Sequence, residues 1–67
     1  MNVGKNIKKY RNMKGMTQTQ LAEKVLVRQQ MILAYERGTK NPSLQVAYEI
    51  SKALGCTLED LIGDGEE

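Results

Sequence analysis

Apolar residues recur at helical spacing along this chain, beginning with Val3, Ile7 and Tyr10. Residues three and four positions apart lie on one face of an α-helix, so the pattern predicts a first helix from about Val3 to Met13. Gly15 follows closely and can adopt the left-handed conformation that commonly ends a helix. We therefore expect the first element to close at this glycine.

Thr17 and Gln20 have the spacing of a capping box and mark the start of a second helix. In such a box the threonine side chain accepts a hydrogen bond from the backbone N–H of the third helical residue, and the side chain of that residue accepts one from the threonine backbone N–H. The helix is expected to end near Leu26, where the helical stripe loses its phase. Its inner face carries Leu21, Ala22 and Val25.

A third helix is predicted from about Arg28 to Glu36, with Gly38 just beyond it. Only about three residues separate it from the second helix, which is the connection length of a helix-turn-helix. At about 100° per residue its positions fall on two sides. The inner side carries Met31, Ile32 and Tyr35. The outer side carries Gln29, Gln30, Leu33, Ala34 and Arg37.

Ser43 and Thr57 have the side chains and positions of N-caps for two further helices. The first of these is expected from about Leu44 to Leu54, with Ala47 and Ile50 also facing inward. The second is short, and its apolar residues are Leu58, Leu61 and Ile62. Residues 63–67 then form an acidic tail. The predicted fold class is all-α, a compact bundle of five helices that contains a helix-turn-helix.

The 67 residues allow a single domain, with its core in about residues 3–62. A chain of this size buries only roughly 60% of its unfolded surface and usually needs added support. Cys56 is the only cysteine and there is no histidine, which excludes a disulfide within the chain and argues against a zinc site. We expect no cofactor, a structural role for Cys56, and support from a second copy of the chain.

The location of the protein is suggested by two further features. A single unpaired cysteine fits a reducing compartment. No apolar run approaches the ~20 residues that span a bilayer, and the first residues lack the apolar core of a signal peptide. The sequence therefore predicts a cytoplasmic protein that does not enter a membrane.

The net charge of +2 conceals a strong asymmetry. Residues 1–40 contain nine lysines and arginines and two acids, a net charge of +7, whereas residues 41–67 contain one lysine and six acids, a net charge of −5. A basic half beside an acidic half suits a protein that meets a polyanion on one side. The alternative interpretation is that these charged residues only keep the surface solvated and bind no polyanion.

The outer side of the third predicted helix has the chemistry of a base-reading surface. A glutamine amide can pair bidentately with N6 and N7 of adenine, which fits Gln29 and Gln30, and apolar Leu33 and Ala34 suit thymine methyl groups. The alternatives are that both glutamines are ordinary solvated residues and that Leu33 packs against a partner protein. The free N–H groups that begin the second helix favour a phosphate, to which Gln18 could also donate.

The order and spacing of several short segments resemble the Cro and phage-repressor type of helix-turn-helix protein, the XRE family. The resemblance covers roughly residues 5–62. The segments are Leu21-Ala22-Glu23-Lys24-Val25, Ile32, Glu36-Arg37-Gly38, Asn41-Pro42-Ser43-Leu44 and Ala53-Leu54-Gly55.

This resemblance implies a lambda-repressor-like bundle of five helices whose second and third helices bind double-stranded DNA. It places Gln29 and Gln30 at base-contacting positions. It also implies a structural ion pair between Arg11 and Glu36, and we expect its loss to unfold the domain. The phosphate contacts that it implies are Thr17, Gln18, Arg37, Thr39, Lys40 and Asn41.

Two residues depart from the pattern of the family. Leu26 occupies the turn position that usually holds glycine, and a positive φ there would be sterically costly for leucine. Arg28 occupies the cap position of the third helix, where its side chain cannot accept the capping hydrogen bond. Its charge also opposes the helix dipole. We therefore expect Arg28 to contact a phosphate or a guanine.

These observations together predict a DNA-binding transcriptional repressor, acting as a homodimer on a near-palindromic operator. We expect the dimer contact at Leu58, Leu61 and Ile62, although these residues could instead only close the core of the monomer. The alternative functions are an antitoxin that binds both DNA and a toxin, and a protein–protein module on the same fold. An enzyme is not expected, because Cys56 has no histidine to activate it and no glycine-rich phosphate loop is present.

Overall fold

The computed structural model describes residues 3–63 of the chain, and all five predicted helices are present. They are α1 (Val3–Met13), α2 (Gln18–Val25), α3 (Gln29–Arg37), α4 (Leu44–Leu54) and α5 (Leu58–Ile62). The bounds of α1 and α4 agree with the prediction, whereas α3 begins and ends one residue later than expected. The all-α fold class is therefore confirmed.

Side-chain caps fix where three of the helices begin. Thr17 and Gln20 form the expected capping box at α2, and the Ser43 hydroxyl accepts a hydrogen bond from the Val46 backbone at α4. Thr57 caps α5 as predicted. Asp60 completes a second capping box there, since its carboxylate accepts the Thr57 backbone N–H. These local contacts explain why the helix starts were predictable from the sequence.

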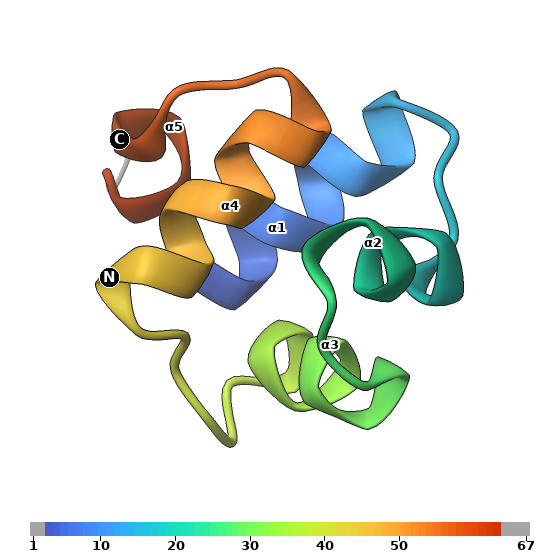
Figure 1. Ribbon diagram of the computed structural model, residues 1–67. Helices are drawn as coiled ribbons and strands as arrows, with labels where there is room; N and C mark the ends of the chain where they lie inside the picture. Colours follow the sequence, from blue (N-terminus) through green and yellow to red (C-terminus); the bar gives the residue numbers. More distant parts are fainter. Residues whose placement is uncertain (1–2, 64–67) are drawn as a thin grey trace.

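Helix α1 packs against α3, α4 and α5, while α2 packs against α3 and α4 (Figure 1). The helices enclose one apolar core, to which each of them contributes. Met31, predicted on the inner side of α3, is half-buried at the edge of this core. The core consists of Val3, Ile7, Leu21, Ala22, Ile32, Tyr35, Ile50, Leu54 and Leu61.

Helix α1 and helix α3 approach each other closely at Gly4. A Cβ atom on Gly4 would lie 1.8 Å from the carbonyl oxygen of Tyr35, well inside the contact distance of the two atoms. Only glycine therefore fits at this crossing. This role of Gly4 could not be predicted from the sequence, because the hydrophobic pattern of α1 does not indicate which helix crosses it.

Leu26 and Gly15 adopt the left-handed backbone conformations that the sequence analysis considered for them. Gly15 has φ +69°, and Leu26 has φ 60° and ψ 40°. The Leu26 side chain is 91% exposed, so no apolar contact compensates for the unfavourable backbone conformation. The turn between α2 and α3 is thus made by a strained leucine.

Helix α5 is held in place by Leu61, which is fully buried, and by a side chain of α1. The Asn6 Nδ2 atom donates hydrogen bonds to the carbonyl oxygens of Leu61 at 2.8 Å and Gly63 at 3.1 Å. These bonds satisfy carbonyl groups that the end of a helix leaves without partners. Since Leu61 closes the core of the monomer, it cannot take part in the expected dimer contact.

Several other expectations concern the ends and the surface. The predicted acidic tail lies outside the described residues except for Gly63. The backbone N–H of Gly63 donates a hydrogen bond to the backbone carbonyl oxygen of Glu59 at 2.7 Å. Within residues 3–63, no helix is long and apolar enough to cross a bilayer. Cys56 is half-buried against the core, and this burial, with the nearby Asp60 charge, raises the pKa of its thiol.

Candidate nucleic-acid interface

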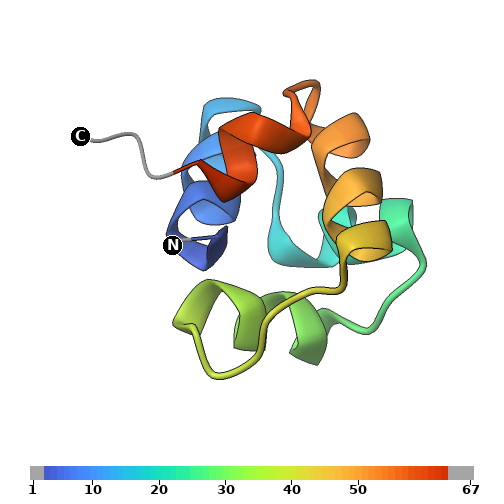
Figure 2. The same cartoon turned by 90° about the vertical axis from the view of Figure 1, so that its left-hand side faces the viewer.

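Helices α2 and α3 form the helix-turn-helix, joined by residues 26–28. They lie in contact along one side of the molecule, with α3 at its lower edge in Figures 1 and 2. Helix α5 lies at the opposite edge (Figure 2). The outer side of α3 therefore faces away from the body of the domain.

The residues predicted on this outer side differ in their exposure. Gln30 and Arg37 are exposed, whereas Gln29, Leu33 and Ala34 are half-buried. Arg28 is the N-cap residue of α3, is exposed, and makes no capping hydrogen bond through its side chain, as expected. This side of α3 thus carries both hydrogen-bonding and apolar side chains, the two kinds of group that can contact base edges in a major groove.

A buried ion pair joins α1 to the last turn of α3. The Arg11 Nε and Nη2 atoms donate to Glu36 Oε2 at 2.7 Å and Oε1 at 3.0 Å. Only 11% of the Arg11 side chain and 3% of the Glu36 side chain are exposed. The hydrogen bond to Glu36 raises the pKa of Arg11, which stays charged. Arg11 Nη1 also donates to the Met16 carbonyl oxygen at 2.8 Å, which fixes the loop before α2.

A chain of amide hydrogen bonds extends from this ion pair to the start of α3. Gln18 Nε2 donates to Glu36 Oε1 at 3.1 Å, and Gln29 Nε2 donates to Gln18 Oε1 at 2.7 Å. Gln18 and Gln29 were predicted in separate roles, as a phosphate contact and a base contact, and their hydrogen bond to each other was not predicted. The fold brings them together because α2 begins beside the first turn of α3.

The loop after α3 is also arranged around its own hydrogen bonds. Gly38 ends α3 with φ +80°, and the Thr39 hydroxyl donates to the Ala34 carbonyl oxygen at 3.3 Å. Thr39, Lys40 and Asn41 are all exposed. Their N–H, hydroxyl, ammonium and amide groups are suited to binding phosphate oxygens.

Lys5 is a basic residue near this loop to which the sequence analysis gave no role. It lies with Arg37 and Asn41 on a surface hollow of about 410 Å³ between the start of α1 and the end of α3. Nothing in the sequence indicates this proximity, because 32 positions separate Lys5 from Arg37. Thr17, which also caps α2, is exposed at the other end of the helix-turn-helix.

The comparisons with known proteins agree with this geometry. A model of the helix-turn-helix family matches residues 7–61. An HTH-type transcriptional regulator of Archaeoglobus fulgidus is 47% identical over 62 residues, covering 91% of this chain and 89% of that protein. The immunity repressor protein of Bacillus phage phi105 is 36% identical over 64 residues, covering 96% of this chain and 44% of that protein.

Two solved structures share the fold at substantial identity. SinR, a master regulator for biofilm formation solved in complex with DNA, superposes with a TM-score of 0.84 at 34% identity, covering 90% of this chain and 97% of that one. A SinR–SinI complex gives a TM-score of 0.87 at 33% identity, covering 92% of this chain and 61% of that one. The chain belongs to the Cro and phage-repressor type of the helix-turn-helix family, whose members are DNA-binding transcriptional regulators and not enzymes.

Proposed function

We propose that this protein is a transcriptional repressor that binds a near-palindromic operator as a homodimer, with α3 in the major groove. The observation that carries this proposal is the outer side of α3, where Arg28 and Gln30 are exposed and Gln29 is held in an ordered position by Gln18. A repressor is favoured over an activator by the similarity to the phage immunity repressor.

The base contacts would come from the first two turns of α3. Gln29 and Gln30 each carry a donor and an acceptor, which suits adenine, and Arg28 suits guanine or a phosphate. Half-buried Leu33 and Ala34 present apolar atoms that would meet thymine methyl groups. A helix docked in this way reads bases with its N-terminal residues.

The phosphate contacts would lie on both sides of α3. At one end, Thr17 and Gln18 stand at the start of α2, whose N–H groups and dipole favour an anion. Gln18 still has one amide hydrogen for this purpose, because only one is directed at Glu36. At the other end are Arg37, Thr39, Lys40 and Asn41, to which we add Lys5.

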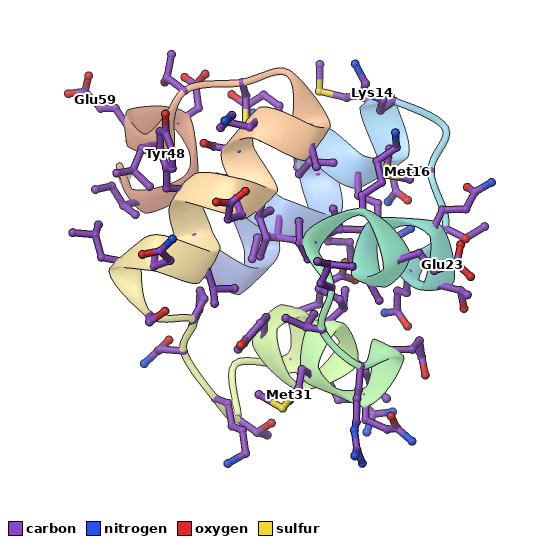
Figure 3. All side chains as sticks on the ribbon, in the orientation of Figure 1. Lys14, Met16, Glu23, Met31, Tyr48 and Glu59 are labelled. Atoms are coloured by element: carbon purple, nitrogen blue, oxygen red, sulfur yellow. The ribbon has the colours of Figure 1, made fainter. Side chains whose placement is uncertain are left out.

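The dimer contact would lie on α5 and the start of α4, at the left edge of the molecule in Figure 1, whereas α2 lies at the right. Leu44 is 70% exposed, and Tyr48, one turn later on α4 and labelled in Figure 3, is 50% exposed. Leu44 also lines an apolar hollow of about 240 Å³ together with half-buried Ile62. Exposed apolar groups gathered in this way mark an interaction surface. Ile62 therefore stays in the proposed contact and Leu44 joins it, and half-buried Leu58 is kept as part of the same helix.

Selection of bound sequences from a random duplex library tests the proposal. We expect a near-palindromic consensus with half-sites about 34 Å apart, the spacing that places two recognition helices on one face of the duplex. A Gln29→Ala, Gln30→Ala double variant should lose the consensus. Gln45→Ala, an exposed glutamine on α4, is the matched control and should keep it.

Two further measurements separate the alternatives. Affinity for random DNA should fall steeply with salt, because each neutralised phosphate releases counterions. Weak binding that does not depend on salt would instead indicate a module that binds only protein. Sedimentation equilibrium should show a dimer that Leu44→Asp dissociates, and a wild-type monomer on and off the operator would contradict the dimer.

A further inference from the structure

We propose that Leu33 makes DNA binding respond to a methyl group at C5 of a pyrimidine, whichever pyrimidine carries it. Cytosine methylated at C5 can then take the place of thymine at one operator position, and methylation of a cytosine there strengthens binding. This inference rests on the proposed function, specifically on contact between the outer side of α3 and the bases.

Leu33 lies between two exposed polar residues on α3. It follows Gln30 by three positions and precedes Arg37 by four, and side chains at these spacings are neighbours on the surface of a helix. Gln30 and Arg37 are exposed, whereas Leu33 and Ala34 are half-buried. The uncovered part of Leu33 therefore places apolar atoms among polar side chains. Covering these atoms with a second molecule removes them from water, which favours binding.

The charges around Leu33 indicate that this second molecule is DNA. Arg28 and Arg37, near the two ends of α3, are exposed cations. The one acid of the helix is Glu36, whose side chain is 3% exposed and is used in an ion pair. An apolar side chain on a helix face with exposed cations and no exposed carboxylate suits the groove of a polyanion.

Leu33 can respond to only one feature of a pyrimidine. In the major groove, thymine presents the O4 acceptor and the C5 methyl group, whereas cytosine presents the N4 amino group and no methyl. Methylation of cytosine at C5 adds a methyl group at the place where thymine carries one. The leucine side chain has no hydrogen-bonding group, so it does not distinguish O4 from N4 and contacts the methyl in either base.

The rest of α3 offers little that would replace this contact when the methyl group is absent. Besides the two glutamines at its start, the helix has no free carboxylate and no serine or threonine to accept a hydrogen bond from the cytosine amino group. Unmethylated cytosine therefore gives Leu33 nothing in place of the methyl. Methylation is then the change at this position that alters affinity.

The test uses four duplexes that differ only in the pyrimidine at one position, which is thymine, uracil, cytosine or 5-methylcytosine. The position is the one at which uracil binds more weakly than thymine in wild-type protein but not in Leu33→Ala. We expect 5-methylcytosine to bind about threefold more tightly than cytosine there, which is the effect of burying one methyl-sized group. Leu33→Ala should abolish this preference. Fluorescence anisotropy measures the four affinities at one fixed salt concentration, because salt changes all of them.

The ratio of the two cytosine duplexes is informative because a lost phosphate contact or a less stable fold weakens binding to both alike. Leu26→Ala makes the same chemical change at an exposed leucine outside α3 and should keep the ratio at its wild-type value. Leu33→Met retains an apolar side chain and should keep the preference for the methyl group. If a thermal melt shows that Leu33→Ala is unfolded, Leu33→Gln replaces it, because its polar end removes the apolar contact.

The outcomes distinguish the inference from the function on which it rests. If Leu33 senses the methyl of thymine but wild-type protein binds cytosine and 5-methylcytosine equally at that position, the inference is overturned and the base contact of Leu33 stands. If Leu33→Ala alters the effect of uracil at no position, Leu33 does not meet a methyl group in DNA. The assigned contact of Leu33 and the inference then fail together, while the contacts of Gln29 and Gln30 are tested separately.

Discussion

Arg11 and Glu36, 25 residues apart in the chain, meet in a two-bonded ion pair whose distances are 2.7 Å and 3.0 Å. The pair is almost completely shielded from water, and Arg11 also holds the loop before α2. Replacing only one residue of such a buried pair strongly destabilises the folded protein, because the remaining charge has no partner. It connects the stability of the domain with the relative placement of α1, α2 and α3, the last two of which form the helix-turn-helix.

The first prediction concerns this pair. Glu36→Leu should lower the free energy of unfolding by about 3–5 kcal/mol, because Arg11 would be left buried and unpaired. The double variant Arg11→Met, Glu36→Leu should recover much of the loss, since no charge then remains in the site. Urea denaturation followed by circular dichroism measures both. A single variant as stable as wild type would show that the pair is not structural.

The second prediction reverses the usual effect of replacing glycine in a helix. Alanine is favoured over glycine in helices by about 1 kcal/mol. Gly4→Ala should nevertheless destabilise the domain by at least about 1–3 kcal/mol, because its Cβ would force α1 away from the Tyr35 carbonyl oxygen. Asn12→Ala, an exposed position on α1, serves as the control and should change stability little. Thermal unfolding of the two variants compares the signs directly.

The third prediction concerns the strained turn. Leu26→Gly should stabilise the domain by about 1 kcal/mol, because glycine adopts φ 60° without steric cost. Little apolar burial is lost, since the side chain is 91% exposed. Leu26→Ala keeps the unfavourable φ and should leave stability nearly unchanged. Equal effects of glycine and alanine in denaturant titrations would argue against backbone strain at this turn.

The fourth prediction separates stability from DNA binding at Arg28. Arg28→Ser should stabilise α3 by about 1 kcal/mol, because serine can cap the helix through its side chain and arginine does not. The same variant should bind DNA more weakly, since the proposed interface loses a positive charge. Unfolding curves and fluorescence anisotropy with labelled duplex measure the two effects. An unchanged affinity in a folded variant would remove Arg28 from the interface.

The fifth prediction concerns the attachment of α5. Asn6→Asp keeps the size of the side chain but replaces the donor with an acceptor that faces two carbonyl oxygens. Unfolding free energy should fall by about 1–3 kcal/mol, and amide hydrogens of α5 should exchange faster with solvent. Asn12→Asp is the matched control on an exposed site of the same helix. Exchange of α5 at the wild-type rate in Asn6→Asp would show that Leu61 alone holds the helix.

The helix starts and most of the core were determined by the sequence alone. Thr17, Ser43 and Thr57 cap helices within four residues of themselves, and Ile50 and Leu54 face inward because α4 repeats every 3.6 residues. The pairing of Arg11 with Glu36 was implied by resemblance to a family, and the structure confirms it. These features depend on neighbouring residues or on a shared pattern, and both can be read along the chain.

The remaining features were decided by tertiary structure. Three of them depend on helices that are distant in sequence. Leu61 faces the core and not a partner, and position 4 must be glycine because of its neighbour on α3. Gln18 links Glu36 to Gln29 because α2 packs beside α3. Neither the helical period nor the capping residues carry information about such neighbours. Packing sets the distance between backbones and the partner of each polar atom, and so only the folded molecule fixes which group of Gln29 is used within the protein.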